Sequence, residues 1–110
     1  MAAGSDHKTR SMNIEVHAIH FKPNSGLVEM VKEKVSKLSE VHHLTLRGDV
    51  YLHIDNNHVK ENKVVELKLK FPGSAIVIKK EAVEFETALN LAVKSAARWL
   101  EKAKEKQVHR

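Results

Sequence analysis

The chain has 110 residues, 42% of them hydrophobic and 30% charged, with a formal net charge of +5. This length suits one ordered domain with one modest core, and the basic balance favours an anionic partner. The absence of cysteine excludes disulfides, thiolate metal ligands and cysteine nucleophiles, and favours a reducing compartment. The absence of an apolar run of roughly 20 residues, or of an apolar leader, excludes a membrane-spanning helix and a signal peptide.

The first half of the chain predicts a strand and then a helix. Residues 1–11 lack hydrophobic periodicity, so we expect a disordered leader or tag there, a domain over 12–107 and a short tail over 108–110. Residues 12–21 alternate between apolar and polar side chains, which is typical of a half-buried strand. Asn24 or Ser25 can cap the helix that follows. An apolar stripe predicts that helix over residues 27–40: Leu27, Val31, Val35 and Leu38.

The second half predicts three strands and a long helix. Residues 49–57 and 63–71 alternate, and the turn "PGS" leads into a short strand over 75–80. From Glu81 to Lys106 the period becomes helical, with one apolar face. We expect that face to consist of Phe85, Leu89, Ala92, Ala96, Trp99, Leu100 and Ala103. The predicted fold is α+β, a β-α-β-β-β-α two-layer sandwich with both helices on one face of a four-stranded sheet.

The exposed side of the last helix carries a basic row at four-residue spacing: Lys94, Arg98, Lys102 and Lys106. Two interpretations remain open on pattern alone. Basic residues late in a helix complement its dipole, so the row can be an ordinary solvated face. It can also be a surface for a polyanion, because Arg98 lies too far from the helix end for the dipole to explain it, and arginine binds phosphate through two nitrogens.

Aromatic residues give little support to base recognition by the sheet. Alternation places Tyr51 alone among the aromatic residues on the open sheet face. Modules that read single strands usually carry several aromatic residues there. We therefore expect any RNA contact to be mainly to phosphate and sugar.

Catalytic and metal sites are not indicated. The eight histidines include pairs such as His17 and His20, or His42 and His43, but none has the spacing of a helical metal motif. Asp49 and Asp55 are too far apart on one strand for paired-carboxylate hydrolysis. We find no nucleophile beside a base, so we expect no enzyme activity, no metal, no cofactor and no small-molecule substrate.

Several segments in order resemble the short ribosome hibernation-promoting factors, the family of the ribosome-associated inhibitor formerly described as sigma-factor modulation proteins. The segments span roughly residues 12–106: "MNIEVHAIHFK", "VEMVKEKVSKL", "VYLHIDN", "VVELKLKFPGS" and "FETALNLAVKSAARWLEKAKEK". The family's β-α-β-β-β-α fold agrees with the order predicted from periodicity.

The resemblance implies a cytoplasmic, non-enzymatic protein of stress or stationary phase, monomeric in isolation. It would bind the small ribosomal subunit and its ribosomal RNA over the tRNA and mRNA sites of the decoding channel, blocking initiation and preserving idle ribosomes. The end of the chain soon after the last helix favours the short form. The matching RNA-binding positions are Lys79, Lys80, Asn90, Arg98, Lys102 and Lys104, to which the basic row adds Lys94 and Lys106.

The sequence also departs from the family pattern. Ser95, Ala96 and Ala97 stand where the family often has Lys-Leu-Glu, and Glu86 stands where an aromatic residue is common. One alternative is a generic double-stranded-RNA-binding domain, because residues 79–82 resemble the "KKxA" start of its last helix. Another alternative is a protein-interaction module with a basic helix. Steep salt dependence would distinguish RNA from protein partners.

Overall fold

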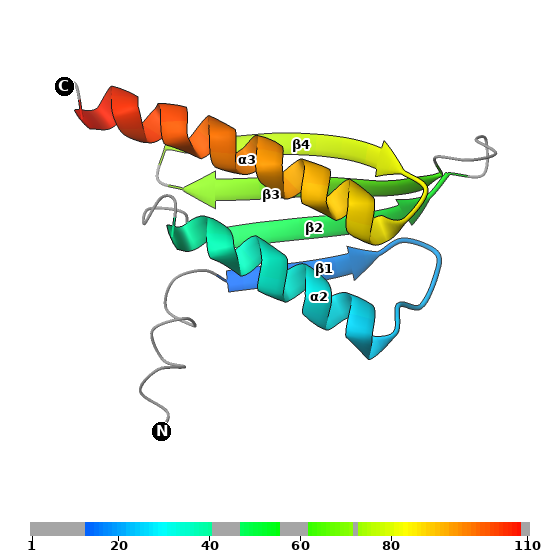
Figure 1. Cartoon of the computed structure of the whole chain (residues 1–110). Coiled ribbons are helices and arrows are strands. Elements are labelled where there is room, and N and C mark those ends of the chain that lie inside the picture. The colour runs from blue at the N-terminus through cyan, green and yellow to red at the C-terminus, as the bar shows by residue number, and fades with distance from the viewer. Residues whose placement is uncertain (1–12, 41–46, 56–61, 72, 109–110) are drawn as a thin grey trace.

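The computed structural model describes residues 13–40, 47–55, 62–71 and 73–108, with side chains described as far as Ala103. The predicted leader, the histidine pair His42 and His43, and His58 between the second and third predicted strands lie outside the described residues. The elements are β1 (Asn13–Ala18), α2 (Ser25–Ser36), the 3-10 turn η1 (Lys37–Glu40), β2 (Arg47–Ile54), β3 (Lys63–Phe71), β4 (Ser74–Ala82) and α3 (Phe85–Val108). Figure 1 shows both helices on one face of the sheet, which confirms the predicted α+β fold.

The four strands lie in the order β1-β2-β3-β4. β1 and β2 are parallel, and the other two pairs are antiparallel hairpins. A parallel pair requires a crossover connection, and α2 is part of that crossover. The first three strands alternate as predicted, so Val50 and Leu52 on β2, with Leu67 on β3, point toward the helices and are fully buried.

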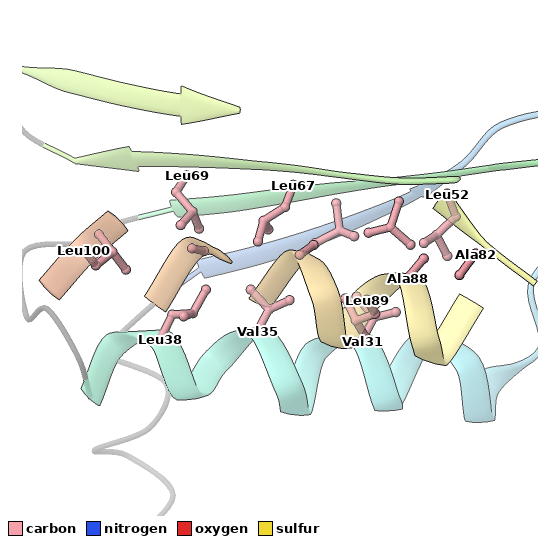
Figure 2. Packing of buried hydrophobic residues seen from close by; sticks show 14 residues of the cluster. Val31, Val35, Leu38, Leu52, Leu67, Leu69, Ala82, Ala88, Leu89 and Leu100 are labelled. Carbon is pink, nitrogen blue, oxygen red and sulfur yellow. The ribbon is translucent and has the colours of Figure 1, made fainter. Parts of the chain in front are cut away.

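One hydrophobic core lies between the sheet and the helices. Both helices contribute fully enclosed side chains, which Figure 2 shows facing those of β2 and β3. The helical members are Val31, Val35, Ala88, Leu89, Ala92, Ala96 and Leu100, with Leu38 from η1. Because the apolar stripe of α3 meets this core along most of its length, the opposite side of the helix has to face solvent.

The N-terminus of α2 is capped as the sequence indicated. Asn24 has an extended backbone, and its side-chain Oδ1 accepts a hydrogen bond from the Leu27 N–H at 2.8 Å. This bond satisfies one of the amide groups that lack a partner at a helix start. Of the two predicted caps, the structure therefore selects Asn24, and Ser25 becomes the first helical residue.

The predicted start of the last helix at Glu81 is wrong. β4 continues to Ala82, and α3 begins at Phe85. Each residue of β3 has a partner on β4, from Phe71 opposite Ser74 to Lys63 opposite Ala82. The ladder with β3 thus keeps residues 79–82 extended, although their own sequence also suits a helix start.

The predicted burial of Trp99 in the core is also wrong. Leu100 is fully buried, whereas Trp99 is 39% exposed. Adjacent helical residues point about 100° apart, so both cannot face the centre of one core. The buried positions of Leu89 and Ala96 agree with Leu100, and they turn Trp99 to the side of the helix.

Candidate nucleic-acid interface

α3 presents four exposed polar side chains at four-residue spacing. We call them the α3 row: Asn90, Lys94, Arg98 and Lys102. Residues four apart lie along one side of a helix, and the burial of Leu89 and Leu100 fixes that side toward solvent. The row therefore consists of predicted site residues that the structure places together on a rigid element.

The α3 row starts beside α2 and moves across the outer surface. Glu86, four residues before Asn90, places Oε2 4.0 Å from the Nζ of Lys34 on α2. Each step of four residues overshoots a full turn by about 40°. The row consequently rotates away from α2 toward Lys102.

The cations of the α3 row remain available to an external anion. Among the described side chains, no carboxylate forms an ion pair with Lys94, Arg98 or Lys102. Glu101 is the one acidic residue between positions 90 and 102. Arg98 lies more than two turns from either end of α3, beyond the reach of the helix dipole. The row is thus a positively charged surface that helix capping does not account for.

Lys79 and Lys80, which the family resemblance matches to RNA-binding positions, do not lie on the last helix. Both lie on β4, and they point to opposite faces of the sheet. Lys79 is exposed on the open face opposite Glu66, whereas Lys80 is half-buried on the helix side opposite Val65. The structure thus separates this predicted pair and leaves Lys79 on the face away from the α3 row.

The last two predicted basic positions, Lys104 and Lys106, belong to the final turns of α3. Their side chains lie beyond the described ones. Helical spacing continues the row to Lys106, so a contribution from these residues stays a prediction.

The open sheet face holds a polar cluster that the sequence did not reveal. Arg47 donates from Nε and Nη2 to the two carboxylate oxygens of Asp49, at 2.9 and 3.1 Å. His17 Nε2 lies 3.1 Å from Asp49 Oδ1, and its ring stacks on Tyr51 with centroids 4.6 Å apart. Lys68 Nζ lies 5.5 Å from the Tyr51 ring centroid. Alternation could place Asp49 and Tyr51 on one face, but bringing His17 beside them required the parallel pairing of β1 with β2.

Among the described residues, Asp49 is the one charged residue that is buried, with 5% of its surface exposed. The Arg47 hydrogen bond holds the pKa of the Asp49 carboxyl below its ordinary value, burial opposes that shift, and the His17 hydrogen bond supports it. Asp49 in turn raises the pKa of Arg47. The guanidinium is therefore committed to an internal partner and is a poor candidate for an external phosphate.

The described residues of the open face carry balanced charge. Alternation places four described cations and four described anions on this face: Arg47, Lys68, Lys70 and Lys79 against Glu15, Asp49, Glu66 and Glu81. The strand register sets Lys68 opposite Asp49 and Lys79 opposite Glu66, although it also sets Arg47 opposite Lys70. Opposite charges at such spacing compensate one another. A polyanion therefore finds less net attraction on this face than along the α3 row.

The described residues contain no arrangement that suggests catalysis. A pocket of about 360 Å³ is lined by Ile19, His20, Phe21, His53 and Ile54. The described residues of its lining include no carboxylate or hydroxyl to pair with either histidine. No group of three or more metal-ligating side chains occurs in the described part of the chain. None of its helices is long and apolar enough to cross a membrane.

Solved structures that share this fold include the following two. A ribosomal subunit interface protein from Coxiella burnetii superposes with a TM-score of 0.76 at 20% identity, covering 86% of this chain and 99% of that one. The N-terminal domain of Thermus thermophilus Protein Y superposes with a TM-score of 0.72 at 17% identity, covering 83% and 98%. A search of curated proteins finds no match.

A protein-family model gives the assignment. The model described as "Sigma 54 modulation protein / S30EA ribosomal protein" matches residues 14–108. This range spans every described strand and helix except the first residue of β1, and it confirms the resemblance drawn from the sequence. The chain therefore belongs to the sigma 54 modulation protein / S30EA ribosomal protein family, whose members are non-enzymatic, ribosome-binding modulators of translation.

Proposed function

We propose that this protein binds the small ribosomal subunit in the cytoplasm, over the tRNA and mRNA sites of the decoding channel. There it blocks initiation and preserves idle ribosomes under stress or in stationary phase. The protein acts as a monomer and without a cofactor. Its main contact with ribosomal RNA is the α3 row, supplemented by the basic last turns of α3.

The family match over residues 14–108 carries this proposal. The similar protein from Coxiella burnetii is described as a ribosomal subunit interface protein, and we extend that location to this chain. The charge distribution supports RNA as the surface recognised. Lys94, Arg98 and Lys102 are exposed without a described ionic partner, whereas the cations of the open sheet face lie among carboxylates.

Sedimentation with purified ribosomes tests the proposal. We expect the protein to migrate with the small subunit at low salt and to return to the top of a sucrose gradient as salt rises, because phosphate contacts release counterions. Subunits separated before mixing test the choice of subunit. A protein that stays at the top at low salt, or that binds only the large subunit, contradicts the proposal.

A generic double-stranded-RNA-binding domain is now less well supported. Its sequence basis was the likeness of residues 79–82 to the start of a last helix, and those residues form the end of β4. A protein-interaction module remains the other alternative. Binding to ribosomes that is insensitive to salt would favour it over the RNA surface.

A further inference from the structure

Trp99 is the most exposed of the phenylalanine, tyrosine and tryptophan residues. All five Phe, Tyr and Trp residues are described. Among them, only Trp99 is exposed, with 39% of its surface accessible to solvent. Phe21 and Phe85 stack on each other with centroids 5.5 Å apart. Tyr51 has His17 stacked on it and Lys68 over its ring. Only the indole of Trp99 thus offers a large aromatic surface to a partner.

The indole is also held in place. Its ring centroid lies 5.6 Å from that of Phe71 at the end of β3, with the two planes tilted by 58°. Such tilted pairs are favourable aromatic contacts. The next residue, Leu100, is fully buried and fixes the rotation of α3. Trp99 therefore loses little conformational freedom when a ligand packs on it, which favours binding.

Cations flank the indole. Arg98 precedes it in the chain, and Lys102 follows on the same side of the helix, three residues later. Both are exposed, and neither pairs with a described carboxylate. A flat aromatic group beside free cations has the chemistry that single-stranded nucleic acid requires, because the bases stack while the cations meet the phosphates.

An apolar protein partner fits this surface less well. The nearest exposed apolar residue along α3 is Leu91, eight positions earlier and so about 12 Å away along the axis. Ser95 lies between them on that side of the helix, and Lys94 and Arg98 are close by. The apolar surface is thus interrupted by polar and charged groups.

We propose that Trp99 is a stacking site for an unpaired RNA base, with Arg98 and Lys102 holding the phosphates on either side of that base. This deepens the proposed function, on which it rests, by adding a base-stacking contact to the phosphate contacts of the α3 row. At this position the RNA contact would then be to a base, in contrast to the expectation from sequence that RNA contacts are mainly to phosphate and sugar.

The fluorescence of Trp99 reports on this site directly, because the chain has no other tryptophan. The full chain is titrated with a single-stranded oligoadenylate, with an abasic oligomer of equal charge and with a blunt RNA duplex. We expect quenching by the oligoadenylate only, because the other two present phosphates without a free base. Equal effects of all three probes, or no effect of any, overturn the proposal.

Variants separate stacking from packing. Trp99→Leu keeps an apolar side chain beside Phe71 but removes the flat ring, and we expect about tenfold weaker binding of labelled oligoadenylate with unchanged binding of the abasic oligomer. Trp99→Phe should retain most of the affinity for oligoadenylate. Tyr51→Leu, on the open face, should leave the binding of both oligomers unchanged. Thermal melts check that each variant is folded. Equal affinity of Trp99→Leu and the parent for oligoadenylate overturns the proposal.

Ribosome sedimentation of the same variants distinguishes this inference from the proposed function. If the parent binds ribosomes and Trp99→Leu binds them equally well, the stacking site is wrong and the proposed function stands. If oligoadenylate quenches Trp99 but the parent does not bind ribosomes, the proposed function is wrong and the stacking site stands. If the emission of Trp99 changes when the protein binds ribosomes but no RNA probe quenches it, the indole contacts a ribosomal protein and the inference is overturned.

Discussion

The Asp49 carboxylate shows how a single residue depends on distant parts of the chain. Its two oxygens accept hydrogen bonds from Arg47 on the same strand, and one of them also lies beside His17 on β1. A buried carboxylate with these partners is stabilised in its ionised form. Removing the partners would leave a buried charge uncompensated, which is costly.

The stability of the protein should fall in acid through Asp49. Its pKa is lowered in the folded state, below the ordinary value of 3.8. The carboxylate therefore contributes stability that is fully present above about pH 4 and is lost as the pH falls through the lower folded pKa. Thermal melts of the parent and of Asp49→Asn over this range measure the effect.

The matched control is Glu29→Gln, an exposed carboxylate on α2. We expect Asp49→Asn to be less stable than the parent near neutral pH and to show a flatter loss of stability in acid. Glu29→Gln should follow the parent. If Asp49→Asn retains the acid dependence of the parent, the Asp49 cluster is not its source.

At the level of elements, α3 combines a structural side and a binding side, and its rotation decides which residues belong to each. Leu89 and Leu91 are two positions apart on this helix. Leu89 is fully buried, whereas Leu91 is 44% exposed. The same substitution at both positions therefore tests the rotation.

We expect Leu89→Ala to lower the free energy of unfolding by about 2–5 kcal/mol, because it leaves a cavity in the core. Leu91→Ala should change it by about 0.5 kcal/mol or less. Phe85→Ala should fall between them, because Phe85 is half-buried and stacked on Phe21. Urea denaturation measures all three. Equal effects at Leu89 and Leu91 would show that the helix is rotated differently.

The cap of α2 provides a second test at this scale. Asn24→Ala removes the acceptor of the Leu27 N–H and should cost about 1 kcal/mol. Asn24→Ser keeps an oxygen acceptor and should restore most of the stability. Melting followed by circular dichroism compares the two. If Asn24→Ala melts at the same temperature as the parent, water replaces the Asn24 cap without loss of stability.

At the scale of the whole molecule, the two faces differ in how their charges are used. The described cations of the open sheet face lie among carboxylates, whereas those of the α3 row have no ion-pair partner among the described side chains. This asymmetry predicts that charge reversal weakens ribosome binding on one face only. The proteins to compare are Arg98→Glu with Lys102→Glu, and Lys70→Glu as the matched control on the open face.

We expect the α3 double variant to keep the parent's thermal transition while its affinity for the small subunit falls at least tenfold. The slope of log affinity against log salt should decrease by about two, one for each lost phosphate contact. Lys70→Glu should bind like the parent. Unchanged binding by the double variant contradicts the assignment of the α3 row, and loss of its thermal transition would make the row structural.

Local patterns were sufficient for much of this fold. Period-two alternation predicted β1, β2 and β3, and a 3.6-residue period predicted α2 and α3, because these elements each bury one side. The same period predicted one exposed row of Lys94, Arg98, Lys102 and Lys106, to which the family resemblance added Asn90. The family resemblance came from the order of such segments, and the family model confirms it.

Long-range contacts decided the remainder. Residues 79–82 suit a helix start locally, but four of the nine residue pairs between β3 and β4 hold them in the strand, which turns Lys79 and Lys80 to opposite faces. Trp99 is apolar enough for a core, yet the burial of Leu100 turns it toward solvent beside Arg98. The Asp49 cluster exists because β1 pairs in parallel with β2. In each case side-chain chemistry permits two environments, and the contacts of residues distant in the chain select one.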